Sequence, residues 1–150
     1  MAPQVWTDAQ FSEMSWHDNH VHGLRLVETG DGGGDLILDI DHIVEWINGA
    51  GSAFEFRILP ATLTFHDVTD LRITLDYATP SAGFTPFMIH GIERREEQRT
   101  HHLAKLWRIP ISWPNGELSF ESRGFTQRAE GEPVLSSGQC LDPEQRNRAV

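Results

Sequence analysis

Apolar and polar residues alternate along several stretches of this chain, with the two-residue period of a β-strand. In "GLRLVE" two leucines flank an arginine, and in "DLILDIDH" the apolar residues alternate with acids that include Asp39 and Asp41. The same period recurs in residues 54–58, 62–66 and 71–77. Strands with one polar face are typical of antiparallel sheets, because one face packs on the core while the other meets water. The pattern therefore predicts a mainly β fold.

The domain organisation follows from the length and the even spread of this pattern. No internal repeat or low-complexity linker divides the 150 residues, and a chain of this length fits one domain with a substantial core. We expect a single-domain antiparallel β-sandwich, roll or partly closed barrel of about seven or eight strands, with one to three short helices. The domain is expected to span residues 1–150, with its ordered core at about 11–128 and a tail at 129–150 that holds a short helix.

Three segments are candidates for helix. "TDAQFSEM" offers Thr7 or Asp8 as an N-cap, and "DPEQRNR" places Asp142 before Pro143, the order expected where a helix begins. "DHIVEWIN" fits either a short helix or a continuation of the preceding strand, because its apolar residues have helical spacing.

A hairpin is predicted for "RIPISWPNGELSFES". The Asn-Gly pair at 115–116 suits a two-residue type I′ turn, since both turn positions need positive φ. Pairing around that turn sets Trp113 opposite Leu118 and Ile111 opposite Phe120, which keeps the apolar residues on one face.

Charge and cysteine content indicate where such a protein works. The net charge is −10, so the surface repels nucleic acid and anionic membranes and is compatible with a basic protein partner. The single cysteine, Cys140, cannot form an internal disulfide, which points to a reducing compartment. The N-terminal residues lack the pattern of a signal peptide, and no window approaches the roughly 18 apolar residues of a membrane span. We expect a cytoplasmic protein, and the sequence leaves its oligomeric state open.

Histidines are concentrated in "WHDNHVHG", residues 16–23. A register that pairs Leu24 with Leu38 in the following hairpin, when continued, pairs His20 with His42. His22 points the same way as His20, because side chains two residues apart share a strand face. The three imidazoles are therefore expected to cluster on the core-facing side of the hairpin.

Such a cluster suggests a metal site. Three histidine nitrogens form the ligand face of a catalytic zinc site, with one position left for water. Asp18 is available as a further ligand or as a carboxylate that orients an imidazole. The candidate metal ligands are thus His20, His22, His42 and Asp18, for zinc or another divalent transition metal. The alternative interpretation is that these histidines are bonded separately to backbone or water at the rim of the core, and no other cofactor is expected.

Motifs of the common enzyme classes are absent. The sequence contains no G-x-S-x-G, no P-loop, no dinucleotide-binding fingerprint and no H-E-x-x-H. Cys140 lies in a polar stretch with no histidine near it in the sequence. These observations favour a non-enzymatic protein over an enzyme.

Several longer strings carry a family resemblance: "FSEMSWHDNHVHGLRL", "GDLILDIDHIVEW", "ILPATLTFHDVTDLRI", "IPISWPNGELSF" and "GFTQ". Together they resemble an uncharacterised family of small bacterial proteins, over about residues 11–144. The resemblance implies a small intracellular bacterial protein of accessory function. It implies no activity, cofactor or site residue.

Two main hypotheses for function follow. The first is a small non-enzymatic binding or interaction protein, accessory or immunity-like, for example one that neutralises a basic toxin. The alternative is a metal-dependent hydrolase built on the histidine cluster, with Asp18 as orienting group or base. A third hypothesis is a small-molecule binder lined by Trp16, Trp46 and Trp107.

Overall fold

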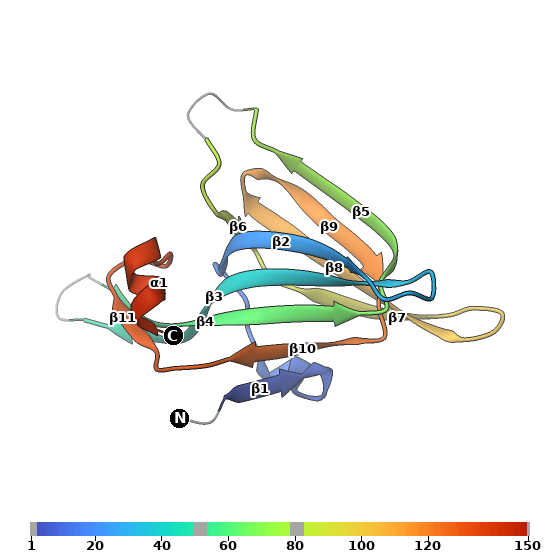
Figure 1. The fold of residues 1–150 in the computed structure, drawn as a ribbon, viewed down its shortest axis with the longest axis horizontal. Helices are drawn as coiled ribbons and strands as arrows, with labels where there is room; N and C mark the ends of the chain where they lie inside the picture. The colour runs from blue at the N-terminus through green and yellow to red at the C-terminus, as the bar shows by residue number, and fades with distance from the viewer. Residues whose placement is uncertain (1–2, 50–53, 79–82, 150) are drawn as a thin grey trace.

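The computed structural model describes residues 3–49, 54–78 and 83–149, and Figure 1 shows how they are arranged. Within these ranges it contains eleven strands, one 3-10 helix and one α-helix. The predicted mainly β, antiparallel fold is confirmed, but the expected number of seven or eight strands is wrong. The alternation pattern missed strands that are only three or four residues long or, in one case, polar throughout.

The elements follow one another along the chain with these bounds: β1 (Gln4–Thr7), η1 (Asp8–Glu13), β2 (His20–Glu28), β3 (Gly34–Asn48), β4 (Phe54–His66), β5 (Thr69–Asp76), β6 (Phe87–Ile89), β7 (Glu93–Gln98), β8 (Leu103–Trp113), β9 (Asn115–Glu121), β10 (Gly124–Ala129), β11 (Val134–Ser136) and α1 (Pro143–Ala149).

The strands form one antiparallel sheet in the order β1-β10-β4-β3-β2-β6-β8-β9-β5, with β11 also paired to β4 and β7 to β8. Among the described strands, β1 and β5 end this path and do not pair with each other, so the sheet is open. It is nevertheless curled, because the rings of Phe65 on β4 and Phe120 on β9 have centroids only 4.7 Å apart. In Figure 1, β5, β8 and β9 accordingly lie across from β2, β3 and β4.

The main core fills the space between the two halves of the curled sheet. From β3 and β4 it takes the fully buried side chains Leu36, Leu38, Ile40, Leu59, Leu63 and Phe65. From β8 and β9 it takes Trp107, Ile109, Leu118 and Phe120. The two-residue alternation predicted from the sequence selects most of these positions, but Leu59, Trp107 and Ile109 lie outside the alternating stretches.

A second, smaller core lies on the other face of β3 and β4. It consists of Ile43, Phe56, Ile58 and Leu141, with Val134 packed against it. The C-terminal segment, residues 134–149, supplies its cover through β11, which pairs with β4, and through the stretch that leads into α1. β1 likewise pairs with β10. Both termini therefore add paired strands outside the expected core of residues 11–128.

The predicted short helices are present at both ends of the chain. Thr7 caps η1: its hydroxyl accepts from Ala9 N, while Gln10 Oε1 accepts from Thr7 N at 2.8 Å. At α1, Asp142 Oδ1 accepts a hydrogen bond of 2.8 Å from Gln145 N. "DHIVEWIN" takes the strand alternative, because β3 continues through it.

The hairpin of β8 and β9 forms with a register different from the predicted one. Leu118 lies opposite Ile109 rather than Trp113, and Phe120 lies opposite Trp107. This shift of four residues keeps every side chain on its face, so alternation does not distinguish the two registers. The predicted type I′ turn is wrong, since residues 115–116 belong to β9 and do not have positive φ.

Gly116 is required at this place for another reason. A Cβ atom on Gly116 would lie 2.2 Å from the carbonyl oxygen of Thr74 on the neighbouring β5. The backbones of β5 and β9 approach too closely for any side chain there.

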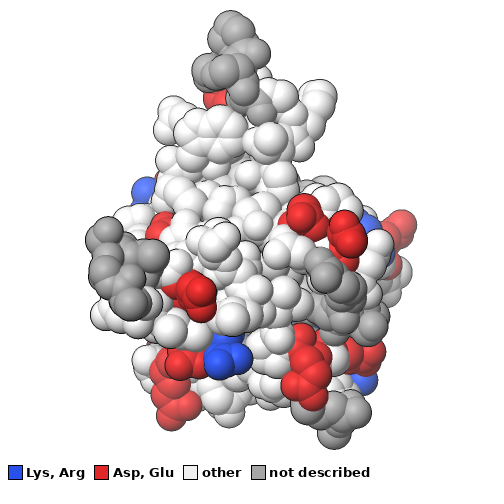
Figure 2. Space-filling view, turned by 90° about the vertical axis from the view of Figure 1, so that its left-hand side faces the viewer, with Lys and Arg blue, Asp and Glu red and all other residues white. Residues whose placement is uncertain are grey.

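Acidic side chains dominate the charged surface at the end of the molecule that carries α1 and β11. Figure 2 looks onto this end, on the left of Figure 1, and shows a largely uncharged surface with scattered acidic groups and little basic surface. In the described ranges, no helix is long and apolar enough to cross a lipid bilayer.

Candidate functional site

A β-bulge in β2 decides where the histidines lie. Leu24 pairs with Leu38 as predicted, but the register shifts between Val21 and Gly23, and His22 is the inserted residue. Val21 and Leu24 both point to the core although they are three residues apart, so the alternation must change phase between them.

The predicted pairs beyond the bulge are wrong. Asp41, not His42, lies opposite His20, and His22 does not pair with Ile40. Because neighbouring residues of a strand point to opposite faces, Asp41 and His42 look away from each other. The three histidines therefore do not converge as the metal hypothesis required.

The four predicted metal ligands separate into different environments. His20 and His22 lie near Asp41. Burial lowers the pKa of His20, and the negative charge of Asp41 raises it by less. His42 lies on the core-facing side of β3, bonded to Asn19. Asp18, outside β2, accepts a hydrogen bond of 3.0 Å from the side chain of Gln139.

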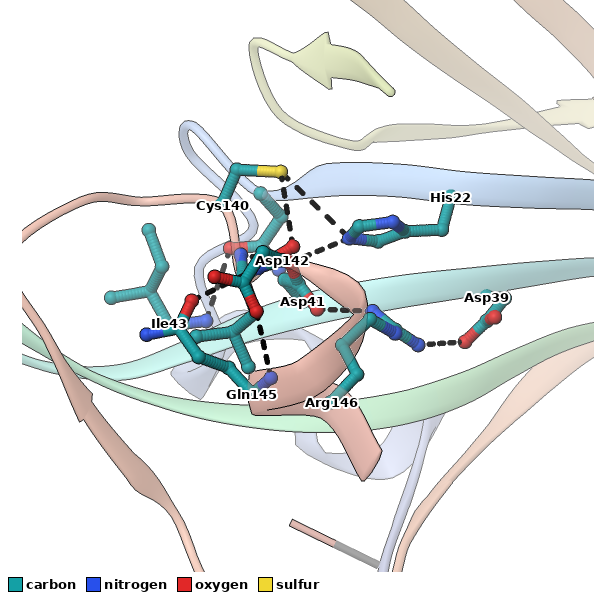
Figure 3. A network of polar contacts seen from close by, with 10 residues as sticks. His22, Asp39, Asp41, Ile43, Cys140, Asp142, Gln145 and Arg146 are labelled. Atoms are coloured by element: carbon teal, nitrogen blue, oxygen red, sulfur yellow. Dashed lines mark hydrogen bonds and ion pairs between the residues drawn. The ribbon is translucent and has the colours of Figure 1, made fainter. Parts of the chain in front are cut away.

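On the outer face of β3, a buried carboxylate gathers donors from distant parts of the chain (Figure 3). Asp41 has 0% of its surface exposed. Its Oδ2 accepts from His22 Nε2 and from Leu141 N, each at 2.7 Å. Its Oδ1 accepts from Arg146 Nη1, and Arg146 also pairs with Asp39. We call these residues, together with Cys140, the Asp41 network.

Cys140 lies beside this carboxylate. Its Sγ is 3.8 Å from His22 Nε2, and one donor atom from each of His22, Asp41 and Cys140 lies within 4.8 Å of the other two. Burial and then the charge of Asp41 raise the pKa of the Cys140 thiol to about 11. The thiol is thus protonated at neutral pH, and the thiolate is the nucleophilic form.

The arrangement also differs from a catalytic triad. In a triad, the nucleophile and the carboxylate contact different nitrogens of the histidine ring. Here both Cys140 and Asp41 approach the same nitrogen of His22. The geometry therefore does not support nucleophilic catalysis by Cys140.

On the inner face, hydrogen bonds fix the tautomer of His42. Asn19 Oδ1 accepts from Ile43 N at 3.2 Å, so the amide of Asn19 turns its NH₂ group toward His42 Nδ1, 2.9 Å away. His42 Nδ1 must then be the acceptor, which leaves the ring proton on Nε2. Burial lowers the pKa of His42 to about 4, so this ring is neutral at physiological pH.

His42 forms part of a pocket of about 400 Å³, which we call the aromatic pocket. Its aromatic walls are Trp6, in edge-on contact with His42, and Trp46, which stacks on His17. Glu13 and Glu45 also line it. His42 lines this pocket and is only 6% exposed, and no described residue forms a hydrogen bond with its Nε2 donor.

A second, open groove of about 460 Å³ runs along β7, β8 and β9. Its charged groups mostly pair with one another: Arg108 contacts Glu93 and Glu117 at 2.7 Å, and Arg99 lies 3.8 Å from Glu121. The charged groups of this groove thus form a solvated ion-pair network. In the aromatic pocket, by contrast, His42 Nε2 and the carboxylate of Glu13 have no hydrogen-bond or charged partner among the described residues.

Comparison with known proteins adds no assignment. No protein-family model matches the sequence, and no curated protein matches it either. The fold and the two sites on β3 therefore carry the functional argument.

Sequence reasoning identified some of these residues and missed others. It singled out His22 and His42, and it named Trp46 as a binding residue together with Trp16 and Trp107. Trp46 does line the aromatic pocket, but Trp16 and Trp107 are core residues, each 2% exposed. Sequence reasoning missed the roles of four other residues in these two sites: Asp41, Arg146, Cys140 and Trp6. Each role depends on contacts between segments that are distant in the sequence.

Proposed function

We propose that this chain is a small non-enzymatic binding protein of the bacterial cytoplasm, and that its aromatic pocket takes a lysine or arginine side chain of a basic partner protein. The observation that carries this proposal is the composition of the pocket: two tryptophans, two carboxylates and the ring of His42, whose Nε2 donor has no partner among the described residues. Each of these groups matches one part of a cationic residue in a peptide.

The tryptophans and Glu13 suit the cation. A cation over a tryptophan face gains about 0.5–1 kcal/mol at an exposed site and about 2 kcal/mol when desolvated. Trp46 is 46% exposed and accessible to a ligand. Glu45 already pairs with Arg57, while Glu13 has no charged partner among the described residues and offers its full charge to a ligand.

His42 suits the main chain next to that cation. Its Nε2–H is a donor, and a peptide carbonyl is a matching acceptor. Because the ring is neutral at physiological pH, it adds no positive charge that would repel a lysine or arginine.

Long-range electrostatics point in the same direction. The net charge of −10 attracts a basic partner and accelerates its association. The end of the molecule at which β3 ends, seen in Figure 2, has mainly acidic charged groups.

The alternative of a metal-dependent hydrolase on His20, His22 and His42 has less support. His42 lies on the opposite face of β3 from the two others, and its Nδ1 is engaged by Asn19. A three-nitrogen face for a catalytic metal would need a rearrangement of the hairpin.

The test is a titration with capped tripeptides. Gly-Lys-Gly and Gly-Arg-Gly should bind with a dissociation constant of about 1 mM, which corresponds to about 4 kcal/mol and matches a single anchored side chain. Binding is followed by tryptophan fluorescence and by NMR shifts of the Trp46 indole. Trp46→Ala and Glu13→Gln should each weaken it severalfold.

Trp113→Ala is the matched control, because Trp113 is similarly exposed, at 41%, and does not line the pocket. Glu96→Gln on β7 is the control for charge. The proposal fails if neither cationic tripeptide shifts the Trp46 signal at 10-fold above that concentration, if Gly-Glu-Gly binds equally well, or if the controls weaken binding as much as the pocket variants.

A further inference from the structure

We propose that His22 Nε2, Asp41 Oδ2 and Cys140 Sγ form a binding site for a zinc-type divalent cation, and that this ion fastens the C-terminal segment to the sheet. The site is separate from the aromatic pocket, with which it shares no lining residue. It also differs from the three-histidine site that the sequence predicted, with which it shares only His22.

The three donor atoms are already close to the spacing that zinc requires. Tetrahedral coordination, with bonds of about 2.0–2.3 Å, sets nitrogen and oxygen ligands about 3.4 Å apart and nitrogen and sulfur about 3.6 Å apart. The distance from His22 Nε2 to Cys140 Sγ is 3.8 Å, and that to Asp41 Oδ2 is 2.7 Å. The second distance must widen by roughly 0.7 Å as the hydrogen bond between His22 and Asp41 is replaced by one bond from each residue to the ion.

The surroundings of Asp41 are those of a supported metal ligand. Arg146 binds Oδ1, the oxygen that the ion does not need, and Leu141 N–H binds Oδ2 alongside the ion. Hydrogen bonds of this kind orient a ligating carboxylate. Asp41 is fully buried, so its position is set before an ion arrives.

Binding is a ligand exchange without oxidation or reduction. The Cys140 thiol releases its proton to solvent as the sulfur–metal bond forms. In the ion-free chain the Nε2 proton of His22 is bonded to Asp41, so the ring changes tautomer, with its proton on Nδ1, and binds the ion through the freed lone pair of Nε2. Water completes the fourth position. The affinity must therefore rise with pH.

The consequence of ion binding is mechanical. His22 belongs to the bulge of β2 and Asp41 to β3, whereas Cys140 belongs to the segment between β11 and α1. An ion held by all three joins residues more than 100 positions apart. It would stabilise the folded chain by mass action, because the unfolded chain does not present the three ligands together.

Cobalt(II) is the direct probe, because thiolate ligation gives an intense charge-transfer band and tetrahedral geometry gives strong visible bands. The untagged wild-type protein should show both and should lose them when one equivalent of Zn²⁺ is added. Zn²⁺ should also raise the melting temperature. Cys140→Ala should abolish the charge-transfer band, and His22→Ala should weaken affinity by more than the 10–100-fold typical of losing a supporting group.

Two controls separate this site from adventitious binding. His20→Ala removes a neighbouring imidazole that is not one of the three ligands, and His102→Ala removes a surface histidine beside Glu121. Both should retain the cobalt spectrum. Arg146→Gln should bind about 10–100-fold more weakly while keeping the charge-transfer band. A wild type without a thiolate band, or one whose metal affinity is unchanged in Cys140→Ala and His22→Ala, would overturn the proposal.

Discussion

Asp41 and His42 are neighbours in the sequence, are both buried, and belong to sites on opposite faces of β3. The donors to Asp41 shown in Figure 3 come from β2 and from the C-terminal segment. His42 has one ring nitrogen engaged by Asn19, and the other has no partner among the described residues, in a ring that lines the aromatic pocket. In the ion-free chain the outer site thus has its donors supplied by the protein itself and ties the C-terminal segment to the sheet, whereas the inner site includes a ring nitrogen without a partner among the described residues.

The largest effect is expected from removing the carboxylate of the outer site. Asp41→Ala leaves the Leu141 N–H without its acceptor and leaves the largely buried guanidinium of Arg146 with only the exposed carboxylate of Asp39. Breaking a buried ion pair in this way costs about 3–5 kcal/mol of unfolding free energy. Urea denaturation measures it.

Asp39→Ala is the matched control, because Asp39 pairs with the same arginine but has a side chain that is 53% exposed. We expect it to cost no more than about 1 kcal/mol. Equal losses of unfolding free energy in the two variants would contradict the view that the contribution of Asp41 to stability depends on its burial.

The second prediction concerns the inner site and pH. The pKa of His42 is about 4 in the folded state and about 6.5 in an unfolded chain. Below pH 6.5 the imidazole of His42 becomes protonated in the unfolded chain, whereas in the folded protein it stays neutral until about pH 4. Stability contributed by neutral His42 is thus complete above pH 6.5 and falls by about 3 kcal/mol as the pH drops to 4.

Denaturation at several pH values tests this, with His42→Gln as the comparison. The variant should lose stability less steeply between pH 6.5 and 4. His20→Gln is expected to reduce the pH dependence of the unfolding free energy less than His42→Gln does. An unchanged slope in His42→Gln would show that the ring is accessible to protons in the folded protein.

The third prediction separates the two cores. Leu141→Ala removes a side chain that is 1% exposed in the small outer core. We expect a loss of about 2 kcal/mol, at the low end for leucine truncation, because the segment can collapse onto the sheet. Leu135→Ala, in the same segment but 53% exposed, should change the unfolding free energy by less than about 0.5 kcal/mol. Comparable losses would mean that the segment is held by its backbone and not by the outer core.

The smallest effect is expected at the start of α1. Asp142→Ala removes the cap on Gln145 N and should cost about 1 kcal/mol, while Asp142→Asn should be nearly neutral because asparagine also caps. Amide hydrogen exchange of α1 measures it locally. If Asp142→Ala leaves exchange unchanged, then the ion pairs of Arg146 hold the helix without its cap.

The sequence predicted the features that depend on local chemistry. Alternation identified the long strands and their core-facing residues, and the capping residues Thr7 and Asp142 marked the helices. Registers were harder to predict. A shift of four residues between β8 and β9 preserves alternation, so apolar matching favoured two solutions equally.

The candidate sites were predicted only in part. The phase change between Val21 and Leu24, with a glycine between them, was a readable signal for the bulge that separates His22 from His42. No comparable signal marks Asp41, because alternation placed it on a solvent-facing strand surface. Its burial depends on Leu141 and Arg146, and contacts across 100 residues leave no trace in local periodicity.

The distance along the chain between Asp41 and its donors has a consequence for protein synthesis. Leu141 and Arg146 are made 100 and 105 residues after the carboxylate that they bind. Because synthesis proceeds from the N-terminus, the residues of all eleven described strands are made before the two donors that the C-terminal segment supplies to Asp41. The ion pair that neutralises the buried Asp41 therefore cannot form until Arg146 has been made, which places the completion of the outer site late in folding.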